Sequence, residues 1–271
     1  MVNGAQRVLV FDSGVGGLSV FDSIAASGHA FELDYAADNA WLPYGLKSDA
    51  DLRARVPTLI SSLARQWAAD AVVVACNTAS TIALDAVRAA VAPPVVGVVP
   101  PIKPAAALTQ TGVIGLLATP ATVKRAYTDD LIAQFAAGKR VVRFGSAALV
   151  EAAERKLRAE AFDPSAITEA IDGLFRAPGG ADIDVVALAC THFPLLTQEL
   201  AAAAPRSVAW LDSGAAIARR VAHVLNAREG AARARVAAFT ADPGALNPAF
   251  SARGFSQLSR IGDAPDFDAP A

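Results

Sequence analysis

Val72-Val-Val-Ala-Cys-Asn-Thr-Ala-Ser80 is the stretch of sequence from which the fold can be predicted. Its run of β-branched residues predicts a buried parallel strand, and the polar residues after Cys76 can begin a helix. A second stretch, Asp184-Val-Val-Ala-Leu-Ala-Cys-Thr-His-Phe-Pro194, repeats the order of strand, cysteine and helix start. The two stretches contain both cysteines of the chain, Cys76 and Cys190. This repeat predicts two similar halves, each with a cysteine at the carboxyl end of a strand.

Strands and helices alternate along the chain. The predicted strands span residues 7–11, 31–36, 72–75, 95–99, 112–117, 140–144, 184–189 and 207–211, with weaker signals at 236–240 and 254–259. Segments with apolar residues at helical spacing separate most of them. This alternation is typical of α/β proteins whose parallel sheets are covered by helices. The two cysteines are separated by about one domain length, so we expect two domains.

Composition and charge restrict the classes of function. Of the 271 residues, 54% are hydrophobic, but no apolar run reaches the roughly 20 residues of a membrane-spanning helix. The 24 basic and 26 acidic residues give a net charge of -2, which provides no basic surface for nucleic acid. Residues 1–7 contain no secretory signal. We expect a cytoplasmic protein with free thiols and with neither a nucleic-acid nor a membrane partner.

The two cysteines are the candidate reactive groups. A lone cysteine in an apolar strand is most often an inert core residue. Two cysteines make a poor zinc site, and the Cys-x-x-Cys motif of redox pairs is absent, so no metal is expected. Their position favours reactivity, because the N-terminus of a following helix lowers the pKa of a thiol.

Two equivalent thiols can act on one substrate if the halves of the chain face each other. One thiolate would remove a proton from one face of a carbon, and the other thiol would return a proton to the opposite face. These steps invert a stereocentre. Proton abstraction beside a carboxylate creates negative charge that prearranged donors must stabilise. Asn77, Thr78, Thr191 and the backbone N–H groups of the helix starts are such donors, and these loops contain no arginine.

Asp12-Ser13-Gly14 follows the first predicted strand and allows two interpretations. Asp12 either caps a helix or has a chemical role, binding a substrate ammonium group or orienting a thiol. Gly16 and Gly17 follow, but the spacing is not Gly-x-Gly-x-x-Gly and no Walker lysine is present, so no nucleotide is indicated. The same tripeptide recurs at Asp212, where a helix cap alone explains it.

Three other side chains also have a structural and a functional interpretation. His192 lies two residues after Cys190, which favours a role in protonation or substrate orientation over simple packing. Glu151, at the start of a predicted helix, would ordinarily be a surface carboxylate. Tyr44, in a Pro-Tyr-Gly turn, would ordinarily be a loop aromatic.

Four motifs, in this order, resemble those of the aspartate/glutamate racemase family, and within it the glutamate racemases. They are Asp12-Ser-Gly-Val-Gly-Gly-Leu-Ser-Val20, Pro43-Tyr-Gly45, Ala75-Cys-Asn-Thr-Ala-Ser80 and Cys190-Thr-His-Phe-Pro-Leu-Leu196. The resemblance covers about residues 7–215. It implies a cofactor-independent enzyme that supplies D-glutamate for peptidoglycan, with glutamate as its small-molecule substrate, and a tendency to form homodimers.

The resemblance also implies a site. It implies that Cys76 acts on D-glutamate and Cys190 on L-glutamate, as the two proton donors and acceptors. The substrate-binding positions it implies are Asp12, Ser13, Tyr44, Gly45, Asn77, Thr78, Thr191 and His192. Asp12, Glu151 and His192 would assist the proton transfers.

The fold implied by the resemblance is two doubly wound parallel-sheet domains related by pseudo-twofold symmetry. The second domain is inserted into the first, so that the C-terminal segment returns to the first domain. We expect residues 1–98 and 212–271 to form the first domain and residues 99–211 the second. The active site would lie in the cleft between them.

Three alternatives stay open from the sequence. A racemase for aspartate or another acidic amino acid differs from a glutamate racemase only in pocket size, which a sequence does not report. A two-lobed binding protein for a small acid would make both cysteines dispensable. Acyl transfer by Cys190 and His192 would leave Cys76 without a role.

Overall fold

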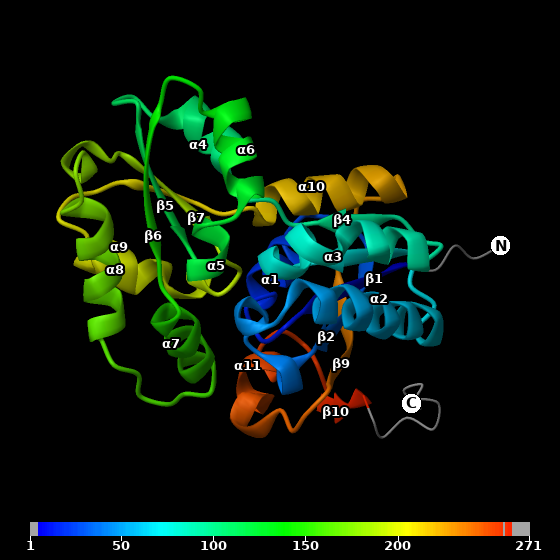
Figure 1. Cartoon of the computed structure of the whole chain (residues 1–271). Helices are drawn as coiled ribbons and strands as arrows, with labels where there is room; N and C mark the ends of the chain where they lie inside the picture. Colours follow the sequence, from blue (N-terminus) through cyan, green and yellow to red (C-terminus); the bar gives the residue numbers. More distant parts are fainter. Residues whose placement is uncertain (1–4, 257, 262–271) are drawn as a thin grey trace.

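The chain forms two lobes, each built on its own β-sheet (Figure 1). The structure is a computed structural model, and it describes residues 5–256 and 258–261. Every strand pair within the two sheets is parallel. The predicted α/β class with two parallel sheets is therefore confirmed.

The first lobe contains a six-stranded sheet. In spatial order its strands are β10 (Leu258–Arg260), β9 (Arg233–Phe239), β2 (Phe31–Ala37), β1 (Gln6–Asp12), β3 (Ala71–Val74) and β4 (Val95–Gly97). All four residues of β3 are buried, as expected for a valine-rich strand in the middle of a parallel sheet.

The second lobe contains a four-stranded sheet that repeats the strand order of the first. Its strands, in spatial order, are β6 (Arg140–Gly145), β5 (Val113–Ala118), β7 (Val185–Ala189) and β8 (Ala209–Leu211). Numbered within each lobe, β2-β1-β3-β4 and β6-β5-β7-β8 both read second, first, third, fourth. The third strands, β3 and β7, are those that lead to Cys76 and Cys190. The repeat predicted from the two cysteine stretches is thus present in the topology.

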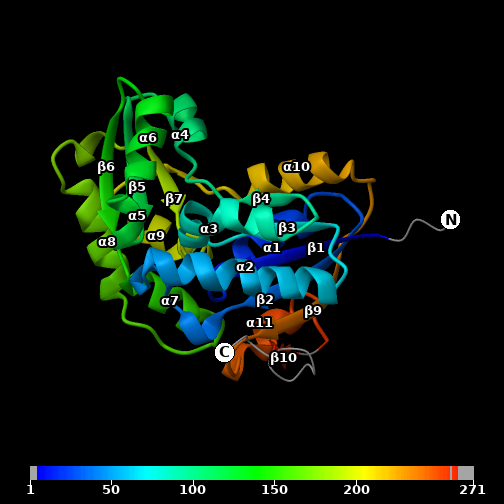
Figure 2. The ribbon, with the colours of Figure 1, turned by 45° about the vertical axis from the view of Figure 1, so that its right-hand side comes forward.

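Helices cover both faces of the first sheet (Figure 2). On one face lie α1 (Leu18–Ala25), α10 (Gly214–Leu225) and α11 (Asn247–Ser251). On the other lie α2 (Asp49–Gln66) and α3 (Asn77–Ala90). Short 3-10 helices connect or flank these elements at η1 (Asn39–Trp41), η2 (Tyr44–Leu46) and η5 (Gly244–Leu246).

The second sheet is covered in the same way. One face packs on α4 (Ile102–Leu108) and α6 (Ala126–Phe135). The other packs on α7 (Ala148–Leu157), α8 (Ser165–Phe175) and α9 (Thr197–Ala203). The remaining short helices are α5 (Pro120–Val123), η3 (Gly180–Asp182) and η4 (Phe193–Leu196).

The chain crosses between the lobes twice, near Val99 and near Ser213. The Ser213 hydroxyl donates a hydrogen bond to the Val99 carbonyl oxygen at 2.5 Å, so the two crossings lie side by side. Strands before the first crossing and after the second belong to the first sheet. This pairing supports our proposal that residues 1–98 and 212–271 form one domain and residues 99–211 the other.

Two elements differ from the sequence prediction. The strand expected at residues 236–240 begins earlier, at Arg233, because it pairs with β2 from Glu32 onwards. Cys190 is followed by the 3-10 helix η4, and the α-helix α9 begins only at Thr197. Pro194 lies inside η4 and cannot donate a backbone hydrogen bond. Residues 1–4, 257 and 262–271 lie outside the described residues, and with them parts of the predicted N-terminal segment and last strand.

Across residues 5–256 and 258–261, no helix has the length and apolar character required to cross a bilayer.

Candidate active site

Cys76 and Cys190 line the same pocket, which lies between the lobes. Cys76 follows β3 as the N-cap of α3, and Cys190 follows β7. Each side chain is 6% exposed. Of the other sequence-predicted residues, the pocket wall includes Ser13, Tyr44, Gly45, Asn77, Thr78, Thr191 and His192. The fold therefore brings the two thiols to one small chamber, together with most of the residues expected around them.

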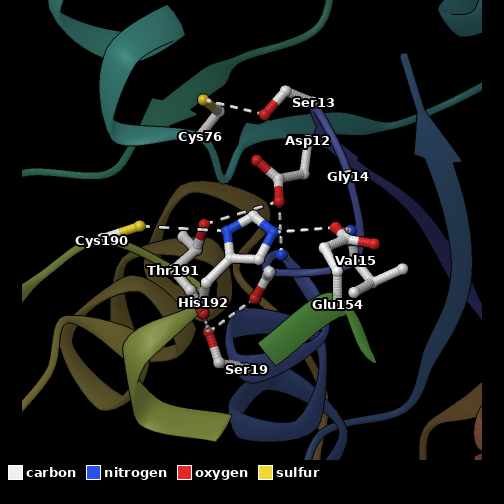
Figure 3. Close-up of polar contacts among 12 residues, drawn as sticks. Asp12, Ser13, Gly14, Val15, Ser19, Cys76, Glu154, Cys190, Thr191 and His192 are labelled. Carbon is white, nitrogen blue, oxygen red and sulfur yellow. Dashed lines mark hydrogen bonds and ion pairs between the residues drawn. The ribbon is translucent and has the colours of Figure 1, made fainter. Parts of the chain in front are cut away.

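His192 connects Cys190 to a buried carboxylate (Figure 3). The Nδ1 atom of His192 lies 3.9 Å from the Cys190 sulfur. Its Nε2 atom lies 2.9 Å from Oε1 of Glu154, which projects from α7. The same Glu154 oxygen accepts a hydrogen bond from the backbone N–H of Val15, across the cleft, at 2.9 Å. Glu154 therefore holds the imidazole and also joins the two lobes.

The Glu154 contact favours a charged imidazolium. Burial alone would lower the pKa of His192, but the hydrogen bonds to Cys190 and Glu154 raise it well above its usual value. Burial likewise would raise the pKa of Glu154, and the hydrogen bond and positive charge of His192 lower it instead. Arg158 adds a second positive charge, 3.0 Å from the other Glu154 oxygen. A positive imidazolium beside Cys190 stabilises negative charge on its sulfur.

The acidic partner of His192 is Glu154, a residue that the sequence analysis did not name. Glu151, which the resemblance implies as an assisting acid, lines the wider cavity beside the pocket, and its role stays a prediction. Glu151 faces solvent, with 73% of its side chain exposed, and its carboxylate lies 3.7 Å from Arg155. Glu154 is 4% exposed because it lies on the buried face of α7, one helical turn after Val150. Helical spacing from Val150 is the sequence signal that could have identified it.

Asp12 and Ser13 lie on the Cys76 side of the site. The Ser13 hydroxyl oxygen is 3.7 Å from the Cys76 sulfur. Asp12 is fully buried; its Oδ2 accepts a hydrogen bond from the N–H of Gly17 at 2.6 Å and lies 3.5 Å from the Thr191 hydroxyl. Within the described part of the chain, its Oδ1 has no hydrogen-bonding partner. Asp12 therefore retains an unused acceptor, and it is the one predicted substrate-binding residue that is not part of the pocket wall.

The helix N-terminus lowers the pKa of Cys76 as predicted, through the N–H of Ala79, but the net shift of this pKa is upward. Burial and then the charge of Asp12 raise the pKa of Cys76 to about 12, and these effects outweigh the N–H of Ala79 and the hydroxyl of Ser13. Burial also raises the pKa of Asp12, although the positive charge of His192 opposes it. Cys76 is therefore a neutral thiol at neutral pH, which suits a proton donor.

The glycine-rich turn after β1 allows the second lobe to approach closely. A Cβ atom on Gly16 would lie 2.7 Å from the Thr191 hydroxyl oxygen and would overlap the His192 ring. A Cβ atom on Gly14 would overlap the Glu154 carboxylate. Gly14 and Gly16 therefore lie against side chains of the opposite lobe, where a larger residue would not fit.

The pocket contains uncharged hydrogen-bond donors that could bind a carboxylate. Asn77 and Thr78 form the first turn of α3, where backbone N–H groups are not used within the helix. Thr191 lies opposite them, and its carbonyl oxygen accepts a hydrogen bond from Ser19 of the first lobe at 2.8 Å. The described pocket wall includes no arginine or lysine. Asp212, which occupies the position of Asp12 in the repeated tripeptide, is exposed, and its carboxylate accepts a hydrogen bond from the N–H of Gly214 at 2.7 Å, while Ser213 is the N-cap of α10.

Tyr44 and Gly45 form the outer part of the wall. Tyr44 is buried, and its hydroxyl donates to Asp38 Oδ2 at 2.7 Å, so the hydroxyl faces away from the substrate space. A wider cavity of about 760 Å³ adjoins the pocket and shares several of its wall residues, among them Pro43, Gly45 and Thr119. The sequence analysis did not identify Thr122 and Val150, which also line the pocket; they come from segments of the second lobe without a distinctive motif.

No cluster of three or more histidine, cysteine, aspartate or glutamate residues suited to a metal ion occurs in residues 5–256 and 258–261.

Comparison with known proteins shows extensive similarity to racemases. Residues 15–221 match the family model described as Asp/Glu/Hydantoin racemase. The chain is 54% identical over 217 residues to the glutamate racemase of Sphingopyxis alaskensis, covering 80% of this chain and 81% of that protein. The crystal structure of Escherichia coli glutamate racemase with L-glutamate and the activator UDP-MurNAc-Ala superposes with a TM-score of 0.88 at 44% identity, covering 94% of this chain and 98% of that one.

Proposed function

The chain belongs to the Asp/Glu/hydantoin racemase family, and we propose that it interconverts L-glutamate and D-glutamate by a two-cysteine mechanism without a cofactor. The main support for this mechanism is the shared pocket: Cys76 and Cys190 both line it, and each follows the third strand of its lobe. Two acid–base groups on opposite sides of one carbon are what inversion of that carbon requires.

Conversion of L-glutamate begins at Cys190. Its thiolate, beside the His192 imidazolium, takes the proton from the α-carbon; the C–H bond breaks and an S–H bond forms. The Cys76 thiol then gives its proton to the opposite face, so that a new C–H bond forms as the S–H bond breaks. The elevated pKa of Cys76 supports this assignment, because Cys76 is protonated before the reaction starts. The reverse reaction exchanges the two roles.

The carbanion needs stabilisation that the pocket can supply. Its negative charge is delocalised into the substrate α-carboxylate, which Asn77, Thr78, Thr191 and the first N–H groups of α3 can bind. The substrate ammonium group would pair with Asp12, whose Oδ1 has no partner among the described residues. Burial is the main cause of the raised Cys76 pKa and the charge of Asp12 the second, and this pairing would offset the second.

Ser13, Tyr44, Gly45 and His192 complete the proposed substrate-binding set. In the cell, the product D-glutamate would supply peptidoglycan synthesis, and we assign the activity to the cytoplasm. Expression of the chain in a bacterium that requires D-glutamate tests the biological role, since growth without added D-glutamate is the expected result. A homodimer stays a prediction.

The substrate is tested by incubating the purified protein separately with L-glutamate and L-aspartate and measuring the D-enantiomers. We expect kcat/KM for glutamate to exceed that for aspartate by about tenfold or more, the range that one methylene group in a fitted pocket provides. Absence of D-glutamate would overturn the proposed function. A higher kcat/KM for aspartate would mean that the protein is an aspartate racemase that uses the same two-cysteine mechanism.

A further inference from the structure

Asp38 is a buried carboxylate on which four hydrogen bonds converge. It follows β2 and is fully buried. Its Oδ2 accepts from the Tyr44 hydroxyl at 2.7 Å and from Arg55 Nε at 2.6 Å. Its Oδ1 accepts from Arg55 Nη2 and from the Thr240 hydroxyl, both at 2.7 Å. The donors come from three separate segments: the loop after β2, the helix α2 and the segment after β9.

The network ends at the wall of the cysteine pocket. Tyr44 is 1% exposed, and its ring belongs to the same apolar cluster as Cys76. Gly45, next in the chain, also lines the pocket. The hydroxyl of Tyr44 holds this loop in place through its hydrogen bond to Asp38. Burial and then the charge of Asp38 keep the Tyr44 pKa far above neutral pH, so the hydroxyl remains a donor. The position of Asp38 therefore sets the position of the wall.

The residues that follow β9 form hydrogen bonds with the start of the same loop. The N–H of Ala40 donates to the Thr240 hydroxyl oxygen at 3.0 Å. The side-chain oxygen of Asn39 accepts from the N–H of Ala241 at 2.8 Å. Residues about 200 positions later in the chain thus hold the start of the loop, after the chain has returned from the second lobe.

We propose that Asp38 is a positioning residue for substrate binding, which with Arg55 and Thr240 fixes the Pro43-Tyr44-Gly45 wall against which glutamate is held. This inference rests on the proposed function. The Asp38 side chain makes no hydrogen bond to either cysteine or to His192 in the described part of the chain. Its contribution is therefore to substrate affinity, and proton transfer proceeds without it.

The test compares steady-state kinetics of the parent with Thr240→Val, Thr240→Ser and Asp38→Asn. Thr240→Val removes one hydroxyl with little change of volume, and Thr240→Ser retains it. We expect Thr240→Val and Asp38→Asn to raise KM for L-glutamate by about fivefold or more, the scale of one or two lost hydrogen bonds, with kcat changed by less than about twofold. Thr240→Ser should keep the parental KM.

Asp34→Asn is the matched control. Asp34 is also fully buried in the β2 segment, and it pairs with Arg235 at 2.6 Å. The Arg235 and Arg55 side chains are similarly exposed, 29% and 31%. Both aspartate variants should lower Tm, because each leaves a buried arginine contact unpaired, but only Asp38→Asn should raise KM.

Unchanged KM in Thr240→Val and Asp38→Asn, or a fall in kcat alone, would overturn the inference while leaving the proposed function intact. A parent protein that does not racemise glutamate would overturn the proposed function, and the inference with it.

Discussion

His192 lies between Cys190 and Glu154, with Nε2 2.9 Å from the Glu154 carboxylate and Nδ1 3.9 Å from the sulfur. The carboxylate is buried, and the hydrogen bonds to Cys190 and then to Glu154 raise the pKa of His192 against the effect of burial. Glu154 therefore contributes to the positive charge beside Cys190 without contacting the sulfur. The proposed mechanism depends on the His192–Glu154 contact most at the step in which Cys190 removes a proton.

Replacement of Glu154 by Gln should slow the conversion of L-glutamate. Loss of a charge-assisted hydrogen bond costs about 1.5–3 kcal/mol, so we expect kcat to fall by roughly tenfold to a hundredfold. Glu151→Gln is the matched control on the same helix, because Glu151 is exposed, and its kcat should stay within about twofold of the parent. Equal effects of the two substitutions would contradict the assignment of Glu154.

The His192–Glu154 pair also makes stability depend on pH. The pKa of His192 is raised on folding, so its contribution is fully present below about pH 6.5 and is lost as the pH rises through the folded-state pKa. The pKa of Glu154 is lowered on folding, so its contribution is present above about pH 4.3 and is lost as the pH falls through its folded-state pKa.

The free energy of unfolding of the parent should therefore exceed that of Glu154→Gln most between about pH 4.3 and 6.5, and the difference should shrink at higher pH. Denaturant titrations at several pH values measure this difference. A difference that stays constant up to alkaline pH would show that the imidazole is not held in its charged form.

Arg125 and Asp49 form the single ion pair that joins the two lobes among the described residues, with Nη2 3.1 Å from Oδ1. Arg125 follows α5 and Asp49 begins α2, close to the loops that carry Thr119 and Gly45 at the pocket. Arg125→Gln should weaken the contact between the lobes beside the pocket and raise KM by about two- to fivefold at low salt, the scale of an exposed ion pair.

The effect of Arg125→Gln should disappear at about 1 M salt, where such pairs are screened. Arg143→Gln is the control, because Arg143 pairs with Asp129 within the second lobe at similar exposure. The same KM change in both variants would mean that substrate binding does not depend on the ion pair between the lobes.

The sequence was sufficient to predict the features that follow from local pattern. Valine-rich strands and the residues after them predicted two parallel sheets and placed Cys76 and Cys190 at strand ends. Both strands hold the third position of their lobe, and the residues that follow them line one pocket. The substrate-binding positions came from the family resemblance; all of them except Asp12 line this pocket, and their role stays a prediction.

Features that depend on long-range packing were not predictable from local pattern. The choice between Glu151 and Glu154 depends on which face of α7 meets His192, and the pKa of Cys76 depends on burial and on the approach of Asp12. The hydroxyl of Tyr44 is bound by Asp38, whose other partner Thr240 is 202 residues away. Such contacts exist only once the C-terminal segment has returned to the first lobe.

The central claim is that two sulfurs act on opposite faces of one carbon, and isotope incorporation tests it most directly. L-Glutamate is incubated with the protein in deuterium oxide and both enantiomers are analysed early in the reaction. We predict that D-glutamate carries solvent deuterium at the α-carbon while the remaining L-glutamate carries little. Cys76→Ser and Cys190→Ser should each reduce racemisation by about a hundredfold or more. D-Glutamate that retains the original proton, or racemisation that survives loss of either thiol, would contradict the mechanism.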